Sequence, residues 1–473
     1  MTAPSIVWFR QDLRLADQAA VAAASADGPW IGVYVLDDDT AGDWAIGAAQ
    51  RWWLHHSLSA LGHDLAGRGG RLVLGRGRSP EILEKVAEYI GAQVVHATRH
   101  YEPWWKTAEN RLERDGALEL RRYDGNRLAP PEGVLTGARG RYRIFTPYWR
   151  ALKDQMPPGR PHPAPRDIRA PHMAIDGDRL DDWGLLPTRP DWAKGFDDWT
   201  PGEAGAREAL DAFLPVLDRY DDDRDRPSVD GTSRLSPHLH FGEISPATLW
   251  LRAAARLHRN AEPWLRQLGW RDFCANIIDI FPDYGAANGR EAWDRMRWRK
   301  GAAADRDFAA WTKGRTGYPI VDAGMRELWA TGVMHNRVRM IAASFLVKHL
   351  LIDWRRGERW FWDTLIDADY GNNAVNWQWV AGTGVDSNPF GRIMAPLVQS
   401  PKFDAGGYIR RWVPELADVE GDAIHDPHGA AVPLSGYPDP IIGHREGRAR
   451  ALAAASEIRR LSQMSATKRL FRP

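Results

Sequence analysis

Short runs of apolar and β-branched residues along the N-terminal part of the chain constrain the fold more than any other feature. These runs are residues 5–9, 30–36, 71–75 and 93–98. Segments with helical spacing of apolar residues lie between and after them, around 44–67, 79–90 and 103–115. Strands that alternate with helices form parallel sheets, because each helix carries the chain back across a face of the sheet. The pattern predicts a doubly wound parallel α/β domain over residues 1–130.

Ligands of a doubly wound sheet bind beyond the carboxyl ends of its strands. In this chain those ends are residues 10–14, 37–39 and 99–105. Neither GxGxxG nor GxxxxGKS/T occurs in the sequence, which counts against a nucleotide-dependent dehydrogenase and a P-loop ATPase.

The remaining chain divides into a connector and a helical half. From Pro157 to Pro201 there are nine prolines and little periodicity, which is typical of a connector that lies over the surface. From Gly205 the apolar spacing is helical almost to the C-terminus. We therefore expect an interdomain connector at 131–204 and an all-helical domain at 205–473, so that the fold class is α/β plus all-α.

The composition limits the chemistry and the location. The single cysteine, Cys274, cannot form an internal disulfide or a cysteine-built zinc or iron–sulfur site, and we expect no metal. The N-terminus lacks a basic segment followed by an apolar run, and no apolar run is long enough to span a bilayer. We therefore expect a cytoplasmic, monomeric protein without membrane contact.

The charge distribution permits a nucleic-acid partner without requiring one. The formal net charge of +1 argues against a uniformly basic binder, but residues 290–411 hold 19 Lys and Arg against 13 Asp and Glu. This segment has either a basic face or a solvated surface of mixed charge.

The stretch from Gly332 to Trp379 combines a helix with many polar and aromatic groups. Apolar residues recur at helical spacing from Val338 to Leu346. Around them lie a polar set, two carboxylates, an amide cluster and several tryptophans: Asn336, Arg337, Arg339, Met340, Asp367, Asp369, Asn372, Asn373, Asn376, Trp354, Trp360, Trp362, Trp377 and Trp379. A bound planar cofactor needs both stacking surfaces and placed hydrogen-bonding groups. Core packing with helix capping is the structural alternative.

The segment GTSRLSPHLHFGEISP contains two possible helix starts. The pairs at 236–237 and 245–246 each have the pattern of an N-cap serine followed by proline. N–H groups at a helix start attract phosphate. Hydroxyls and a positive charge precede the first pair: Thr232, Ser233 and Arg234. The segment is a candidate phosphate site, and plain capping is the alternative.

Several motifs of the helical half resemble those of the photolyase and cryptochrome family. They are GTSRLS, WLRQLGWRDF, KGRTGYPIVDAGMREL, HNRVRM, LIDWRRGERWF, LIDADYGNN and NWQWVAGTG, in the family's order and near its spacing. The opening VWFRQDLRLAD resembles the family's N-terminal antenna domain. The resemblance covers most of the chain and is densest at 205–420. It implies an N-terminal antenna domain, a helical domain that binds FAD, and UV-damaged DNA as the partner.

The resemblance implies a set of FAD contacts. GTSRLS matches the family's grip on the FAD pyrophosphate, and Arg339 with Asp367 matches its ion pair beside the isoalloxazine ring. Asn373 aligns with the residue that faces flavin N5, where an amide can donate or accept a hydrogen bond. The expected cofactor-binding residues are Tyr220, Thr232, Ser233, Arg234, Leu235, Ser236, Trp264, Arg271, Asn336, Arg339, Asp367, Asp369 and Asn373.

The resemblance also implies an electron path. Trp377, Trp354 and Trp298 match the family's tryptophan chain, which passes electrons from the surface to the flavin. Core packing is the alternative for each of them. Together with Asn373, Gln267 and Asn336, they form the expected catalytic set.

A further group of residues matches the family's contacts to damaged DNA. We expect two stacking walls, a polarizable contact, two hydrogen-bonding amides and three phosphate-binding arginines. These are, in that order, Trp270 and Trp379, Met340, Asn336 and Gln267, and Arg271, Arg337 and Arg392. Enzymes of the family that repair cyclobutane pyrimidine dimers (CPDs) usually have Glu where this chain has Gln267. Gln can form hydrogen bonds but cannot donate a carboxyl proton, so the departure bears on repair efficiency and lesion type.

The resemblance leaves the antenna chromophore open. One group in the family has an Asn-Glu pair for methenyltetrahydrofolate roughly where this chain has Trp104 and Trp105. A ring-stacking variant of the folate site, as in class III enzymes, is the first expectation, and a deazaflavin is the second.

The main hypothesis is light-dependent repair of CPDs by electron transfer from photoexcited reduced FAD, as in bacterial class I and class III photolyases. A cryptochrome-type blue-light photoreceptor is the alternative. It is disfavoured because the lesion-pocket residues are present and no long polar tail follows the helical domain. A (6-4) photolyase is a third possibility. The animal type has a second His where this chain has Asn336, and the iron–sulfur type needs four cysteines.

Overall fold

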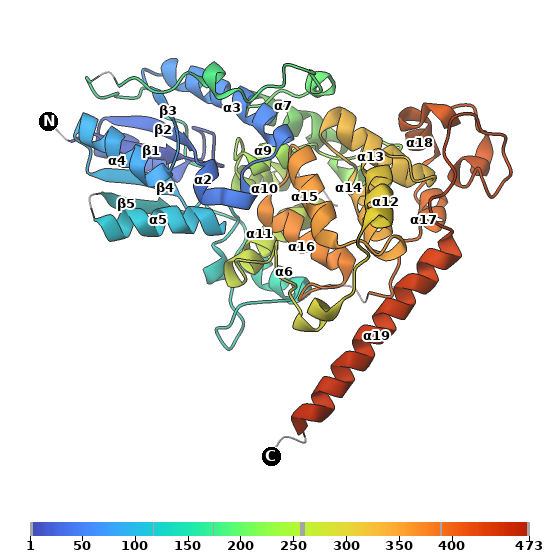
Figure 1. The fold of residues 1–473 in the computed structure, drawn as a ribbon. Coiled ribbons are helices and arrows are strands. Elements are labelled where there is room, and N and C mark those ends of the chain that lie inside the picture. The colour runs from blue at the N-terminus through green and yellow to red at the C-terminus, as the bar shows by residue number, and fades with distance from the viewer. Residues whose placement is uncertain (1–2, 117, 174, 256–260, 388–389, 471–473) are drawn as a thin grey trace. The chain divides into compact units, whose positions relative to one another are not determined.

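The computed structural model describes residues 3–116, 118–173, 175–255, 261–387 and 390–470, with the side chains described to residue 460. The chain forms two compact units (Figure 1). The first comprises 1–220, 232–282 and 366–371, and the second comprises 221–231, 283–365 and 372–473. Part of the helical half therefore packs with the sheet in the first unit.

The first unit contains the expected parallel sheet. Its five strands lie in the order β3-β2-β1-β4-β5, and every neighbouring pair is parallel. The strands are β1 (Ser5–Phe9), β2 (Trp30–Leu36), β3 (Leu72–Arg76), β4 (Val94–Thr98) and β5 (Glu119–Tyr123). The first two are buried along their whole length, as expected for central strands of a doubly wound sheet. Strand β5 was not predicted, because ELRRY is a polar edge strand without an apolar run.

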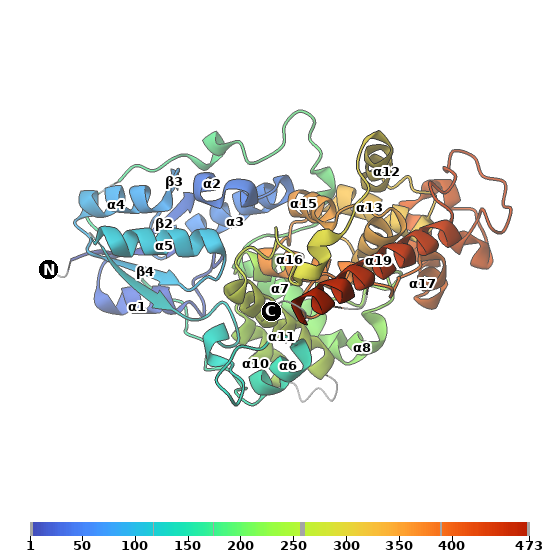
Figure 2. The same cartoon turned by 60° about the horizontal axis from the view of Figure 1, so that its bottom comes forward.

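Helices cover both faces of this sheet (Figures 1 and 2). They are α1 (Ala19–Asp27), α2 (Asp38–Ala41), α3 (Ala48–Ala66), α4 (Ser79–Ile90) and α5 (Pro103–Asp115). The three expected helices are confirmed as α3, α4 and α5, whereas α1 and the short α2 were not predicted. The strand order runs outward in both directions from β1 and β4, so successive right-handed crossovers place α1 and α5 on opposite faces.

The connector is mostly irregular, as expected, but it contains one helix that the sequence analysis missed. This helix, α6 (Phe145–Lys153), buries Phe145, Tyr148, Trp149 and Leu152, which recur at helical spacing. The tryptophans of the connector are also held in place. The indole of Trp183 donates to Asp178 Oδ2 at 2.9 Å, and Trp199 packs edge-on against Trp53 with ring centroids 5.5 Å apart.

The all-helical prediction for the C-terminal half is confirmed within the residues that the structure describes. The helices that complete the first unit are α7 (Glu203–Phe213), α9 (Ser236–His240), α10 (Pro246–Ala254) and α11 (Glu262–Ile280). Those of the second unit are α12 (Ala302–Thr312), α13 (Pro319–Thr331), α14 (Asn336–Ser344), α15 (Trp354–Thr364), α17 (Pro396–Lys402), α18 (Gly406–Trp412) and α19 (His444–Leu470). Two further helices, α8 (Tyr220–Asp223) and α16 (Tyr370–Ala381), begin in the first unit, at the end of segments 1–220 and 366–371, and continue into the second unit. None of the described helices has the length and apolar character that crossing a membrane requires.

The two serine–proline pairs behave differently. Ser245 is the N-cap of α10, and its Oγ accepts from Thr248 N at 2.9 Å, as predicted. The corresponding prediction for Ser236 is wrong. Leu235 occupies the N-cap of α9, and the Ser236 hydroxyl instead donates to Asp367 Oδ2 at 2.7 Å. A distant carboxylate therefore replaces the local backbone as the partner of this hydroxyl.

Candidate functional site

The segment before α9 presents hydroxyls and a guanidinium on the first unit. Thr232, Arg234 and Ser236 are exposed, whereas Leu235 is only 1% exposed and anchors the segment. Arg234 has a φ of +53°, which is unusual for a non-glycine residue. Its guanidinium lies 4.2 Å from the centroid of the Trp199 ring. The exposed Thr232 hydroxyl and the neighbouring guanidinium suit a phosphate-bearing ligand better than a plain helix cap.

An aromatic cluster in the same unit unites two of the expected FAD contacts. Tyr220 and Trp264 both pack against Phe213, with ring centroids 5.8 and 5.3 Å from it. Tyr220 is 8% exposed and Trp264 is 3% exposed. The cluster brings together residues from α7, α8 and α11 that lie far apart in the sequence.

Two expected site residues belong to a buried charge network of the first unit. Asp369 is 5% exposed, and its Oδ2 lies 3.7 Å from Arg127 Nη2. Arg271 is 6% exposed, and its guanidinium donates to the carbonyls of Asn126 and Leu239. Burial, reinforced by Arg127, lowers the pKa of Arg271 to about 9. The prediction that Arg271 holds DNA phosphates is corrected, because its donors are directed to backbone carbonyls in the interior.

The expected flavin-facing amide lies beside a buried acid in the second unit. Asn373 Nδ2 donates to the backbone carbonyl of Glu358 at 3.1 Å. The Glu358 carboxyl is fully buried, and neither of its oxygens has a hydrogen-bond partner among the described residues. Burial raises its pKa well above the ordinary value. A buried acid without a hydrogen-bond partner destabilises the folded protein. A polar group of a ligand that formed a hydrogen bond to it would remove this cost.

The start of α14 gathers three of the expected lesion contacts. Asn336 Nδ2 and Arg337 Nη1 each lie 4.0 Å from the Met340 sulfur. The Arg337 guanidinium pairs with Asp225 and stacks over Phe403, 4.4 Å from the ring centroid. Arg339, on the same helix, donates through Nε to Met334 O at 2.7 Å. The polar face that the sequence predicted is therefore present and held in place by its neighbours.

The three tryptophans of the expected electron path, which would form a relay to the flavin, lie in the second unit and differ in burial. Trp354 is 0% exposed, Trp377 is 3% exposed and Trp298 is half-buried. The indole of Trp354 donates to Asn288 Oδ1 at 3.0 Å. Trp377 packs closely on α15, where a Cβ at position 357 would lie 2.2 Å from its Cη2 atom, so Gly357 is required there. Trp377 also contacts Phe361, with ring centroids 5.0 Å apart.

On the first unit, α11 presents a half-buried tryptophan and glutamine. Trp270 stacks face to face on Phe145 of α6, with centroids 3.5 Å apart and an interplanar angle of 10°. Gln267 lies one turn before it and donates through Nε2 to Pro263 O at 2.9 Å. That bond uses one of its two amide hydrogens.

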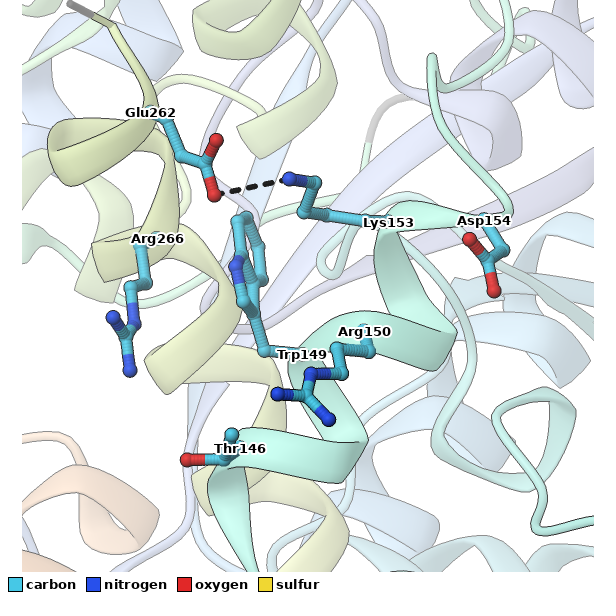
Figure 3. A pocket seen from close by; sticks show the side chains of 7 residues that line it. All are labelled: Thr146, Trp149, Arg150, Lys153, Asp154, Glu262 and Arg266. Atoms are coloured by element: carbon cyan, nitrogen blue, oxygen red, sulfur yellow. Dashed lines mark hydrogen bonds and ion pairs between the residues drawn. The ribbon is translucent and has the colours of Figure 1, made fainter.

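A basic pocket of about 410 Å³ lies between α6 and α11 (Figure 3). Trp149 projects from α6 toward α11, and Lys153 pairs with Glu262 at 3.0 Å. Close packing of the two helices depends on Gly269, where a Cβ would lie 2.4 Å from Trp149. The lining residues are Thr146, Trp149, Arg150, Lys153, Asp154, Glu262 and Arg266.

Four further expected residues, from the lesion and antenna sets, differ in burial. Trp379 is half-buried and Arg392 is exposed, both in the second unit. Trp104 and Trp105 are 7% and 8% exposed. Trp104 contacts Tyr370, and Trp105 contacts Trp8 edge-on at 6.0 Å. No group of ligands suited to a metal ion occurs in the part of the chain that the structure describes.

Sequence reasoning missed three residues of these sites. Glu358 follows Gly357 in the quoted LIDWRRGERWF motif, but nothing in the motif shows that its carboxyl is buried without a partner. Phe145 belongs to a helix that was not predicted. Arg127 lies at the end of the predicted α/β domain, and its partner Asp369 is far away in the sequence.

Comparison with known proteins decides the family. Residues 5–166 match the family described as DNA photolyase, and residues 264–457 match the FAD binding domain of DNA photolyase. The chain is 47% identical over 480 residues to a deoxyribodipyrimidine photo-lyase of Agrobacterium fabrum, covering 97% of this chain and 99% of the relative. This chain belongs to the DNA photolyase family.

Relatives within the photolyase family include photoreceptors as well as repair enzymes. The chain is 35% identical to cryptochrome-1 of Arabidopsis thaliana and covers 71% of that protein's length. A crystal structure of a class III photolyase from Agrobacterium tumefaciens superimposes with a TM-score of 0.91 at 46% identity, covering 97% of this chain and 98% of that one. An archaeal photolyase from Sulfolobus tokodaii with two FAD molecules superimposes with a TM-score of 0.82 at 28% identity, covering 96% of this chain and 100% of that one.

Proposed function

We propose that this photolyase splits cyclobutane pyrimidine dimers in DNA in a light-dependent reaction that uses reduced FAD. The observation that carries the proposal is the near full-length similarity to deoxyribodipyrimidine photo-lyases, together with the presence of the residues expected to contact the lesion. Signalling as a cryptochrome is the second candidate, because plant cryptochromes are also relatives. The stacking and amide residues favour repair, since a photoreceptor has no use for a lesion pocket.

FAD, when bound and photoexcited in its reduced form, supplies the electron that opens the dimer. The chain's own residues hold the cofactor and set its surroundings. The exposed Thr232 hydroxyl and the Arg234 guanidinium would bind its phosphates. The Asn373 amide would form a hydrogen bond to the flavin ring, and the buried Glu358 acid would keep its proton and act as a donor.

The substrate is held by stacking and by phosphate contacts. Trp270 is pre-organised by Phe145 as a wall for a flipped-out base, and base stacking is worth roughly 1–3 kcal/mol per base. Arg337 and Arg392 are the expected phosphate contacts on the second unit. The pocket between α6 and α11 adds Arg150, Lys153 and Arg266, which suit a phosphodiester backbone.

We also infer that the protein works as a monomer in the cytoplasm. A damaged DNA strand is the only partner that the site residues require, and the single cysteine fits a reducing compartment.

The FAD proposal predicts a stoichiometry and a matched pair of variants. Denaturing the purified protein should release one FAD per chain, without covalent attachment. Ser236→Ala should weaken FAD binding about tenfold, because it removes the hydroxyl that donates to Asp367, a carboxylate expected to lie beside the flavin ring. Ser245→Ala, which removes a plain helix cap, should leave FAD affinity unchanged and serves as the control. A colourless protein that cannot be reconstituted with FAD would contradict the proposal.

For the antenna we propose methenyltetrahydrofolate near Trp104 and Trp105, with a deazaflavin as the alternative. The two indoles form a nearly buried aromatic surface beyond strand β4, and a pterin ring can stack on such a surface. Replacing both tryptophans with Ala should abolish the near-UV antenna band and leave the FAD spectrum unchanged. An antenna band that persists in the double variant would place the chromophore elsewhere.

A further inference from the structure

Lys348 is a buried lysine on the helical turn that follows α14. It belongs to a π-helical segment, Phe345–His349, and is only 1% exposed. Its Nζ donates to the carbonyl of Arg392 at 2.7 Å and lies 5.5 Å from the centroid of the Phe390 ring. Among the described residues, no carboxylate forms an ion pair with it. Burial of an amine whose main partner is one backbone carbonyl costs free energy, and the hydrogen bond to that carbonyl offsets part of this cost.

The same helix holds the backbone around Arg392 at a second point. Ser344 lies one turn before Lys348, and its Oγ accepts from Met394 N at 3.1 Å. Phe390, on the other side of Arg392, stacks on Trp293 with centroids 5.0 Å apart. The backbone that carries Arg392 is therefore fixed on both sides, whereas Arg392 itself is exposed.

We propose that Lys348 is a positioning residue for DNA binding: it fixes the backbone of Arg392, and it takes up a proton when a DNA phosphate binds near Arg392. The inference rests on the proposed function, in which Arg392 contacts the phosphates. It adds a residue that cannot touch DNA and a proton that accompanies binding.

The electrostatics around Lys348 give the direction of the effect. Burial first, and then the charge of Arg392, lower the pKa of Lys348 to about 7. A phosphate near Arg392 offsets that positive charge and raises the pKa, so the complex binds more protons than the free protein near neutral pH. DNA affinity must therefore fall as the pH rises from about 7, by the usual linkage between protonation and binding.

The other titratable groups around Lys348 do not produce this effect. Burial lowers the pKa of His349 to about 3, so this residue stays neutral. On α19, His444 Nδ1 lies at hydrogen-bond distance, 3.0 Å, from His349 Nε2. Burial also lowers the pKa of His444. Arg450 on the same helix is a permanent cation, 3.4 Å from His349 O.

Calorimetric titration of the FAD-loaded protein with UV-irradiated oligo(dT), in darkness and in two buffers of different ionisation enthalpy, measures the proton uptake. Wild-type protein should take up a fraction of a proton at pH 7.5. Lys348→Arg should bind as tightly as wild type at pH 7 without that uptake, because Arg keeps a donor that does not titrate. Lys348→Met should bind about fivefold more weakly, also without the uptake. Lys85→Met, at an exposed lysine of α4, is the matched control and should behave like wild type.

Two results distinguish failure of the inference from failure of the proposed function. Equal proton uptake in wild type, Lys348→Arg and Lys348→Met, with normal DNA binding, would refute the role of Lys348 and leave CPD repair intact. A wild-type protein that does not bind the oligonucleotide would refute the proposed function, and the inference with it. In an Arg392→Ala background, Lys348→Arg should cause no further change in proton uptake, whereas a further change would refute the link to Arg392.

Discussion

Replacing Trp377 with Phe should slow photoreduction of the oxidised flavin by about tenfold or more, because phenylalanine is far harder to oxidise than tryptophan. Repair by enzyme that has been reduced beforehand should be unaffected, since the dimer receives its electron from the cofactor and not from this residue. The packing of Trp377 supports its assignment to a relay. It is 3% exposed, lies against α15, the helix that begins at Trp354, and depends on Gly357 for that approach.

The measurement is the rate of flavin bleaching under blue light with an external reductant. Trp362→Phe is the matched control, since Trp362 is equally buried at 4% exposed but has no place in the expected relay. The control should photoreduce at the wild-type rate. If Trp377→Phe also photoreduces at the wild-type rate, Trp377 is a packing residue and the relay assignment is wrong.

Removing the amide of Gln267 should lower the quantum yield of CPD splitting several-fold, because a buried thymine carbonyl would lose its hydrogen-bond donor at a cost of about 1–3 kcal/mol. The Gln267 amide donates one hydrogen to Pro263 O and keeps a second one for the substrate. The quantum yield of Gln267→Ala should therefore be clearly lower than that of wild type, and the quantum yield of Gln267→Glu should be equal or modestly higher.

The comparison of Ala and Glu at position 267 separates two roles for the Glu carboxyl that CPD repair enzymes of the family usually have there. If the carboxyl acts mainly as a hydrogen-bond donor to the thymines, Gln is an adequate replacement and wild type is active. If a protonated carboxyl must stabilise the reduced dimer, only Gln267→Glu will show full activity, since charge-assisted bonds are about twice as strong as neutral ones. Gln93→Ala, at an exposed position outside the helical half, controls for general effects of losing a glutamine.

The sequence predicted the elements whose signal is local. The central strands β1 and β2 are continuous apolar runs and were recognised, whereas β5 has the sequence ELRRY and was not. Helix α6 carried a clear apolar spacing but lay in a proline-rich connector, and this context outweighed its pattern.

The site followed the same division. Apolar spacing predicted the helix that carries Asn336 and Met340, and in the structure Asn336 Nδ2 lies 4.0 Å from the Met340 sulfur. The partners of Ser236 and Arg271 come from distant segments, which explains why the predictions of an N-cap role for Ser236 and a phosphate contact for Arg271 were wrong. Burial of the Glu358 carboxyl depends on tertiary packing, which no spacing in the motif reveals.

The most direct test of CPD repair is the quantum yield of wild-type protein, loaded with FAD and reduced, on UV-irradiated oligo(dT). Light should restore the thymine absorbance in proportion to the photons absorbed, and no change should occur in the dark. Protein that binds the dimer but does not split it under light, with activity appearing only in Gln267→Glu, would contradict CPD repair and favour the photoreceptor.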